Sequence, residues 1–161
     1  MLKGIDVSTV QGDINWTRVK RFGVDFAMIK ATQGRGEGAS TKHLRVFTDS
    51  RFEKNINAAH AAGIACGVYH YFTATNTAEV DEEAEYFIRT IRPYRDKITL
   101  WAAVDVESEM YLEKIGKHPL TALVERFLRK IEAAGFKPML YANPNYLFYR
   151  YDSAGFPGAS V

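Results

Sequence analysis

Two acids follow an apolar run in ITLWAAVDVES at 98–108. The run predicts a buried strand, and side chains two residues apart in a strand point to the same face, ~6.6 Å apart along the chain. Asp105 and Glu107 are therefore expected to share a face, opposite Val104 and Val106. Clustered carboxylates repel, so at least one of them holds its proton more tightly. A protonated acid beside an ionised one is the arrangement that glycoside hydrolysis needs, which makes this pair a candidate catalytic site.

A third acid lies on the first predicted strand. In GIDVS, Asp6 faces away from the apolar side chains of Ile5 and Val7. The active sites of parallel barrels lie at the carboxyl ends of the strands. We therefore expect two different strands to bring Asp6, Asp105 and Glu107 to one place.

The elements that must position these acids alternate between strands and helices. Strands are predicted over 3–8, 24–31, 64–71, 99–107 and 137–142, with helices at about 16–22, 49–62, 78–91 and 119–134 between them. Gly23, Gly63 and Gly135 follow three of these helices, at the left-handed position that suits glycine. Strands alternating with helices predict a parallel sheet with right-handed crossovers. Several strands are apolar on both faces, as a parallel sheet covered by helices requires.

A closed barrel is favoured over an open sheet of the Rossmann type. The first strand lacks the glycine-rich phosphate turn of that fold. The segment GRGEG at 34–38 follows the second strand instead and is interpreted as a loop. The predicted fold class is therefore α/β, a modified TIM-like (β/α) barrel of parallel strands with its active site at the carboxyl-terminal face. No linker divides the chain, so 1–161 is expected to be a single catalytic domain.

Composition limits the partners. The 161 residues are 47% hydrophobic, with a net charge of +2 and no basic block, so no nucleic-acid partner is expected. The single cysteine, Cys66, cannot form an internal disulfide and is interpreted as a small buried hydrophobe. No apolar run approaches the ~18 residues of a membrane span, and the N-terminus shows no secretory signal, so no membrane partner is expected. The oligomeric state is not indicated.

The sequence resembles glycoside hydrolase family 25, the lysozymes that act as N-acetylmuramidases. The matching segments, in family order, are KGIDVSTVQGDINW at 3–16, FAMIKAT at 26–32, DSRFEKNINAAHAAGIACGVYHYF at 49–72, AVDVE at 103–107 and PMLYAN at 138–143. The resemblance implies a modified barrel of eight strands with fewer helices. It also implies cleavage of the β-1,4 bond from N-acetylmuramic acid to N-acetylglucosamine in bacterial peptidoglycan, with no metal or cofactor.

The resemblance also assigns catalytic roles. Glu107 would be the general acid that protonates the leaving oxygen. Asp105 would orient the N-acetyl group of the substrate, whose carbonyl attacks the anomeric carbon in a retaining, substrate-assisted route. Asp6 would shape the field and the hydrogen bonding around the sugar.

Three tyrosines at strand ends are expected to bind the substrate. Tyr69 and Tyr141 match family tyrosines that line the groove, and Tyr71 is expected to contact the glycan with them.

The sequence departs from the family at Gln33, where a glutamate is usual. It also stops at GFPGASV, where the family expects two more strands, a Trp-x-Ala-x-Tyr segment and a further acid. We therefore expect a barrel truncated at its C-terminus, with open strand edges.

Such an enzyme is expected to act outside the cell or on release to the bacterial wall, as a phage endolysin does.

Three alternatives remain open. A chitinase-like hydrolase would carry further acids before Asp105, where Ala103 and Trp101 stand. A metal-dependent deacetylase would use Asp6, Asp105 and His70 as ligands, although His70 has the opposite strand parity to Tyr69 and Tyr71. A non-catalytic wall-binding module would keep the groove alone, but binding does not require a clustered acid pair.

Overall fold

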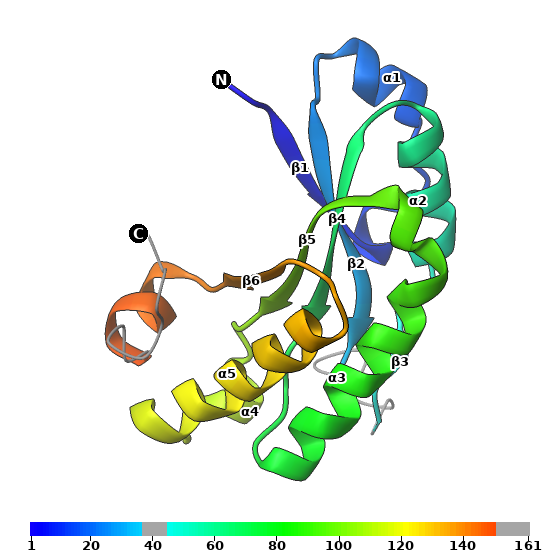
Figure 1. The fold of residues 1–161 in the computed structure, drawn as a ribbon. Coiled ribbons are helices and arrows are strands. Elements are labelled where there is room, and N and C mark those ends of the chain that lie inside the picture. Colours follow the sequence, from blue (N-terminus) through cyan, green and yellow to red (C-terminus); the bar gives the residue numbers. More distant parts are fainter. Residues whose placement is uncertain (37–44, 151–161) are drawn as a thin grey trace.

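The computed structural model describes residues 1–36 and 45–150, and within them six strands form one sheet. The sheet order is β1 (Gly4–Val7), β2 (Phe26–Gln33), β4 (Ala65–Tyr71), β5 (Ile98–Asp105) and β6 (Pro138–Tyr141), all parallel (Figure 1). The two-residue β3 (Phe47–Thr48) pairs antiparallel with β2. Part of the predicted loop at 34–38 lies outside the described residues.

The four predicted helices are present as α1 (Trp16–Arg21), α2 (Phe52–Ala61), α3 (Thr77–Ile91) and α5 (Lys117–Ala133). The short strand β3 was not predicted, nor were four short helical elements: the 3₁₀ helices η1 (Thr9–Gln11) and η3 (Arg92–Lys97), the single turn α4 (Glu109–Leu112) and the π-helical η4 (Tyr146–Arg150). None of the helices in the described part of the chain is long and apolar enough to cross a membrane.

Local sequence signals explain where the helices begin and end. The Asn76 side chain caps α3 by accepting a hydrogen bond from the Glu79 amide at 3.0 Å. Gly23, Gly63 and Gly135 have φ values of 78°, 71° and 80°, which confirms the left-handed positions predicted after three helices. These turns return the chain from each helix to the start of the next strand.

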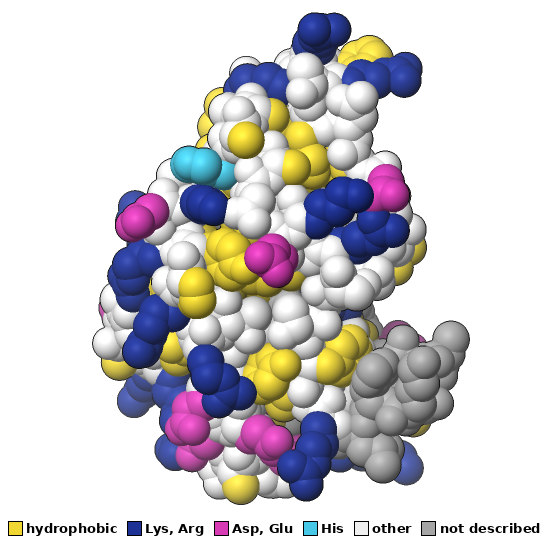
Figure 2. Space-filling model, turned by 90° about the vertical axis from the view of Figure 1, so that its right-hand side faces the viewer, with side chains coloured by type: hydrophobic (Ala, Val, Ile, Leu, Met, Phe, Trp, Pro, Cys, Tyr) yellow, Lys and Arg dark blue, Asp and Glu magenta, His cyan; other side chains and the backbone are white. Residues whose placement is uncertain are grey.

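The two faces of the sheet have different surroundings. On one face, Ile29, Val68 and Val104 are fully buried in the hydrophobic core. Helices α2, α3 and α5 pack on this face, and Phe127 of α5 lies at its centre, with its ring 5.8 Å from the Phe72 ring and 6.0 Å from the Phe87 ring. On the outer surface of the side formed by α1, α2 and α3, Lys and Arg side chains are interspersed with Asp and Glu (Figure 2).

The opposite face carries no covering helix among the described residues, and the sheet they form is open. There, β1 pairs only with β2 along one edge and β6 pairs only with β5 along the other. The predicted α/β class with a parallel sheet is confirmed, and the strands form the arc of a TIM-like fold without closing it.

The burial of Phe127 in the core leads to a prediction about the free energy of unfolding. Phe127→Ala removes a fully buried ring and is expected to lower the free energy of unfolding by about 3–5 kcal/mol, because the surrounding aromatic side chains cannot fill the cavity. Phe22→Ala, at a side chain that is 68% exposed, is the control and should change it by no more than about 0.5 kcal/mol. Urea denaturation measures both; equal losses would show that the core is not centred on Phe127.

Candidate active site

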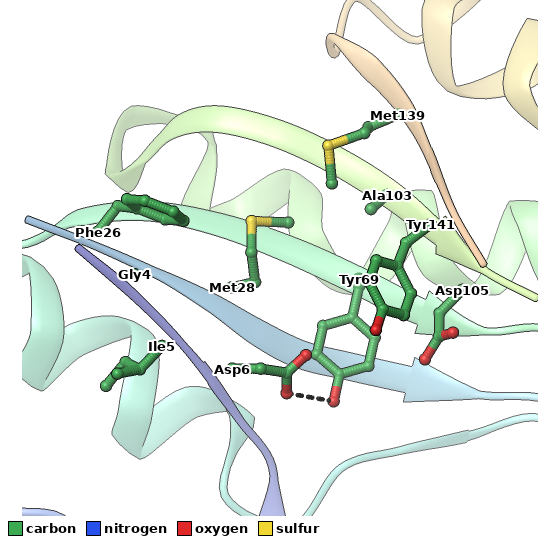
Figure 3. Close-up of a pocket in the computed structure, with 10 residues that line it drawn as sticks. All are labelled: Gly4, Ile5, Asp6, Phe26, Met28, Tyr69, Ala103, Asp105, Met139 and Tyr141. Carbon is green, nitrogen blue, oxygen red and sulfur yellow. Dashed lines mark hydrogen bonds between the residues drawn. The ribbon is translucent and has the colours of Figure 1, made fainter. Parts of the chain in front are cut away.

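A pocket of about 280 Å³ lies on the uncovered face of the sheet (Figure 3). Five strands contribute to its lining, which consists of Gly4, Ile5, Asp6, Phe26, Met28, Tyr69, Ala103, Asp105, Met139 and Tyr141. Figure 3 shows the polar side chains gathered toward the carboxyl ends of the strands, with Phe26 and Met28 toward the other end. The pocket therefore has an apolar floor and an acidic mouth.

Small residues make room for this floor. A Cβ atom on Gly4 would lie 2.1 Å from the Phe26 ring, and one on Gly67 would lie 2.3 Å from the Met28 sulfur. Both contacts are far shorter than packed atoms allow, so glycine at these two positions lets larger side chains from the neighbouring strand lie across the sheet.

Tyr69 connects the middle of the sheet to its first strand. Its hydroxyl donates a hydrogen bond to Asp6 Oδ1 at 3.0 Å (Figure 3). Burial and the Asp6 charge raise the pKa of Tyr69, so the phenol stays protonated and remains a donor. Burial also raises the pKa of Asp6, against the lowering effects of the Tyr69 hydrogen bond and the nearby Lys30 charge. Asp6 is thus fixed in orientation by a neutral donor.

Asp105 is the most perturbed acid of the site. Its side chain is 8% exposed, and within the described residues Oδ1 is buried without a hydrogen-bond partner. Burial, followed by the charges of Glu107 and Asp6, raises the pKa of Asp105 to about 8, although Lys30 acts in the opposite direction. At neutral pH the Asp105 carboxyl is therefore mainly protonated.

Glu107 does not lie on the strand, and the predicted strand over 99–107 is wrong at its end. Strand β5 stops at Asp105, because the chain turns at Ser108 to begin α4. The Val106 amide still donates to the Tyr141 carbonyl at 2.9 Å, which holds the segment against β6. Burial and the Asp6 charge raise the pKa of Glu107, so it is electrostatically part of the acid cluster although it does not line the 280 Å³ pocket.

The three predicted tyrosines do not share one position. Tyr69 and Tyr141 line the pocket with Asp6 and Asp105, and Tyr141 is 51% exposed at its mouth. The negative charge of Glu107 is the main cause of the raised pKa of Tyr141. Tyr71 instead lines a second hollow of about 470 Å³ at the ends of β1, β2 and β4.

The sequence interpretation missed Lys30. Its charge lowers the pKa of both Asp6 and Asp105, and its Nζ lies 5.0 Å from the centroid of the Tyr71 ring. A signal was available, because a lysine that alternates with Phe26 and Met28 in an otherwise apolar strand marks a face that is not packed in a core.

His70 does not fit the metal-dependent alternative. Its fully buried ring faces the helices, on the other side of the sheet from Asp6 and Asp105. There its two nitrogens lie 2.7 Å from Thr32 Oγ1 and 2.8 Å from Glu83 Oε2. In the part of the chain that the structure describes, no group of three His, Cys, Asp or Glu side chains is arranged to hold a metal ion.

The fold and the site define the class: a parallel α/β protein with a carboxylate cluster at the carboxyl ends of its strands, as in barrel hydrolases. The sequence profile of the family "Glycosyl hydrolases family 25" matches residues 5–159. The chain belongs to this family.

Individual relatives agree with this placement. Over 107 residues the chain is 39% identical to Lysozyme M1 of Streptomyces globisporus, covering 66% of this chain and 33% of that protein. It is 28% identical over 159 residues to the N,O-diacetylmuramidase of a Chalaropsis species, covering 90% and 67%. A family 25 glycosyl hydrolase structure from Bacillus anthracis superposes with a TM-score of 0.77 at 28% identity, covering 98% of this chain and 67% of that one. The chain thus spans one third to two thirds of the length of these relatives.

The buried Asp105 carboxyl predicts a pH-dependent cost in stability. Its pKa is higher in the folded chain than the ordinary value of 3.8, so the folded state binds the proton more tightly and loses stability as pH rises from about 4 to 8. Asp105→Asn removes this titration. Its stability relative to the parent is expected to rise by about 2–4 kcal/mol between pH 5 and pH 8.

Urea denaturation of both proteins at the two pH values measures this difference. Asp96→Asn, at an exposed acid on η3, is the matched control and should show no such change between pH 5 and pH 8. A stability difference for Asp105→Asn that is the same at both pH values would contradict the raised pKa.

Proposed function

We propose that this chain is the catalytic part of a peptidoglycan hydrolase, an N-acetylmuramidase that cleaves the β-1,4 bond between N-acetylmuramic acid and N-acetylglucosamine. Its membership of family 25 and its similarity to a lysozyme and a muramidase support this class of reaction. The proposed partner is the glycan strand of the bacterial wall, which places the activity outside the cell or at the wall. Residues 1–161 act as one catalytic unit in this proposal.

The observation that carries the proposal is the pocket at the strand ends, which is lined by Asp6 and by an Asp105 carboxyl whose pKa is raised by burial and by the neighbouring acids. A structural acid at a strand end would be solvated or hydrogen-bonded. The Asp105 carboxyl instead lines the pocket, where a ligand can bring a hydrogen-bond donor to it. The acetamido N–H of an N-acetyl sugar is such a donor.

Binding of that group has an electrostatic consequence. A hydrogen bond from the acetamido N–H to Asp105 stabilises its carboxylate form and lowers its pKa. The proton that Asp105 holds in the free protein then passes to Glu107, because an ionised Asp105 raises the proton affinity of its neighbour. Substrate binding thus protonates Glu107, the general acid, and Asp105 becomes the anion that orients the acetamido group.

The reaction then proceeds in two steps. Glu107 donates its proton to the glycosidic oxygen while the acetyl carbonyl oxygen attacks the anomeric carbon, so the C1–O bond to the leaving sugar breaks and a cyclic oxazolinium forms. In the second step, water attacks the anomeric carbon from the side opposite the oxazolinium oxygen and gives a proton to Glu107, while the bond between C1 and that oxygen breaks and the acetamido group is restored. Two inversions produce retention, and the protein regains its starting protonation state.

The other side chains position the sugar. The Tyr69 hydroxyl holds Asp6 toward the pocket, where its charge favours the protonated form of Glu107 and the positive charge that develops on the sugar ring. Tyr141, exposed at the mouth, offers a ring face to the glycan, and Tyr71 extends the contact beside Lys30.

Digestion of purified peptidoglycan tests the proposal directly. After borohydride reduction of the products, mass spectrometry should find reduced muramic acid at the new ends. Glu107→Gln should lower kcat by at least about 100-fold, the usual contribution of a general acid, with the free energy of unfolding little changed. Glu109→Gln, at an exposed acid two residues further on, is the matched control and should keep the parent's activity.

Other outcomes would change the assignment. Reduced glucosamine at the new ends would replace the muramidase by a glucosaminidase. Retained glycan binding without any product would favour the non-catalytic wall-binding module. Unfolding of Glu107→Gln would make Glu107 a structural residue and remove the proposed general acid.

A further inference from the structure

A buried polar network lies behind the acid cluster, on the helix side of the sheet. His70 of β4 is fully buried, and its Nε2 is hydrogen-bonded to Glu83 Oε2 of α3 at 2.8 Å. Glu83 is 3% exposed and accepts two more hydrogen bonds, from the Thr73 hydroxyl at 2.8 Å and the Thr73 amide at 3.2 Å. On its other side, the His70 ring contacts Thr32 of β2, with Nδ1 2.7 Å from Oγ1. The proposed reaction uses none of these groups.

Thr32 lies at an irregularity of β2 that decides which side chains face the groove. Lys30 pairs with Tyr69 and Thr32 with His70, so Ala31 is an extra residue in β2. Because of this bulge, Thr32 turns to the helix side. Bulges beside active sites commonly re-aim side chains in this way.

The bulge places Gln33 in the groove beside Lys30. Lys30 precedes the extra residue and faces the groove with or without it. Lys30 and Gln33 both line the hollow that contains Tyr71, and Lys30 Nζ donates to Gln33 Oε1 at 2.5 Å. Without the extra residue, the side chain of Thr32 would take the place beside Tyr71. The bulge therefore determines whether Gln33 stands where its side chain can hold the Lys30 ammonium.

We propose that His70 and Glu83 are positioning residues that hold the β2 bulge through Thr32, and thereby hold Gln33 where it fixes the Lys30 ammonium beside the catalytic acids. This inference rests on the proposed function for its effect on catalysis, but its effect on the acids themselves does not depend on activity.

Close packing of the following loop supports the proposal. A Cβ atom on Gly34 would lie 2.1 Å from both Glu83 Oε1 and Thr73 Oγ1, so the backbone after β2 lies directly on the network. The Arg35 amide donates to Thr73 Oγ1 at 2.7 Å, and the Ala31 carbonyl accepts from the Asp49 amide at 2.9 Å. The chain on both sides of Thr32 is thus fixed to neighbouring elements.

The charged and titratable groups around Asp105 define the expected effect. Asp6, Glu107, Tyr69 and Tyr141 face it from β1, the β5 end, β4 and β6, and Lys30 of β2 is the cation among them. Moving Lys30 away removes an influence that lowers the pKa of Asp105. A loosened bulge should therefore raise that pKa further.

The test compares the parent with Thr32→Val, which keeps the side-chain shape and removes the hydroxyl, and with Glu83→Gln. Thr121→Val is the matched control, because Thr121 is a buried threonine of α5 whose hydroxyl donates to the Lys117 carbonyl, away from β2. Carbon-13 NMR of the carboxyl groups gives the pKa of Asp105 in each protein, and peptidoglycan digestion gives kcat and KM.

In Thr32→Val and Glu83→Gln the pKa of Asp105 is expected to rise by about half a unit or more relative to the parent. We expect kcat to fall about tenfold with KM little changed, because the glycan still binds but the acids are displaced. Thr121→Val should match the parent in both the Asp105 pKa and kcat.

An unchanged Asp105 pKa in folded Thr32→Val and Glu83→Gln overturns the proposal, whether or not the parent cleaves peptidoglycan. A parent that does not cleave, with the pKa shift still present, would overturn the function and leave the positioning role supported.

Discussion

The carboxyl group of Asp105 is held where one of its oxygens reaches neither water nor a protein donor, and this desolvation governs the site. An ionised acid in that position is unfavourable, so the group keeps its proton and makes the ionisation of its neighbours depend on its own. Such a position persists only when the backbone beneath it is rigid. Strand β5 provides that rigidity, because it is paired on both sides and buried along the face opposite the acid.

The two faces of the sheet have different roles: one packs against the helices and stabilises the fold, and the other carries the acid cluster. Aromatic and aliphatic side chains of three helices fill one side around Phe127, where each buried ring contributes to the free energy of folding. On the other side, Gly4, Gly67 and Ala103 keep the surface hollow, and only the end near the strands' carboxyl termini is polar. The buried His70–Glu83 pair connects the two faces. It belongs to the core face, but it sets the register of β2, whose other face carries Lys30.

Much of this arrangement could be predicted from the sequence, and particular residues show where prediction stops. Apolar periodicity and the glycines after helices located the five parallel strands and four helices, and strand parity brought Asp6 and Asp105 together. The predicted end of the strand was wrong, because β5 stops at Asp105, but Glu107 still lies close enough to Asp105 and Asp6 to interact with both charges. Strand parity could not place Gln33, since a bulge has no sequence signature and shifts the pattern by one residue at Ala31. The clustered acids predicted that at least one of them would hold its proton more tightly, but that Asp105 is this acid depends mainly on its burial, which no local pattern shows.

The most direct test of this account is the titration of the Asp105 side chain in the unmodified chain. Assigned carboxyl carbon-13 shifts followed from pH 3 to pH 10 give its ionisation without any substrate. The account predicts a main transition near pH 8, well above those of the solvent-exposed acids, with a smaller response where Glu107 ionises. A single transition near pH 4 would show that Asp105 is solvated and ionised like an ordinary surface acid, and would contradict the proton sharing on which the proposed reaction depends.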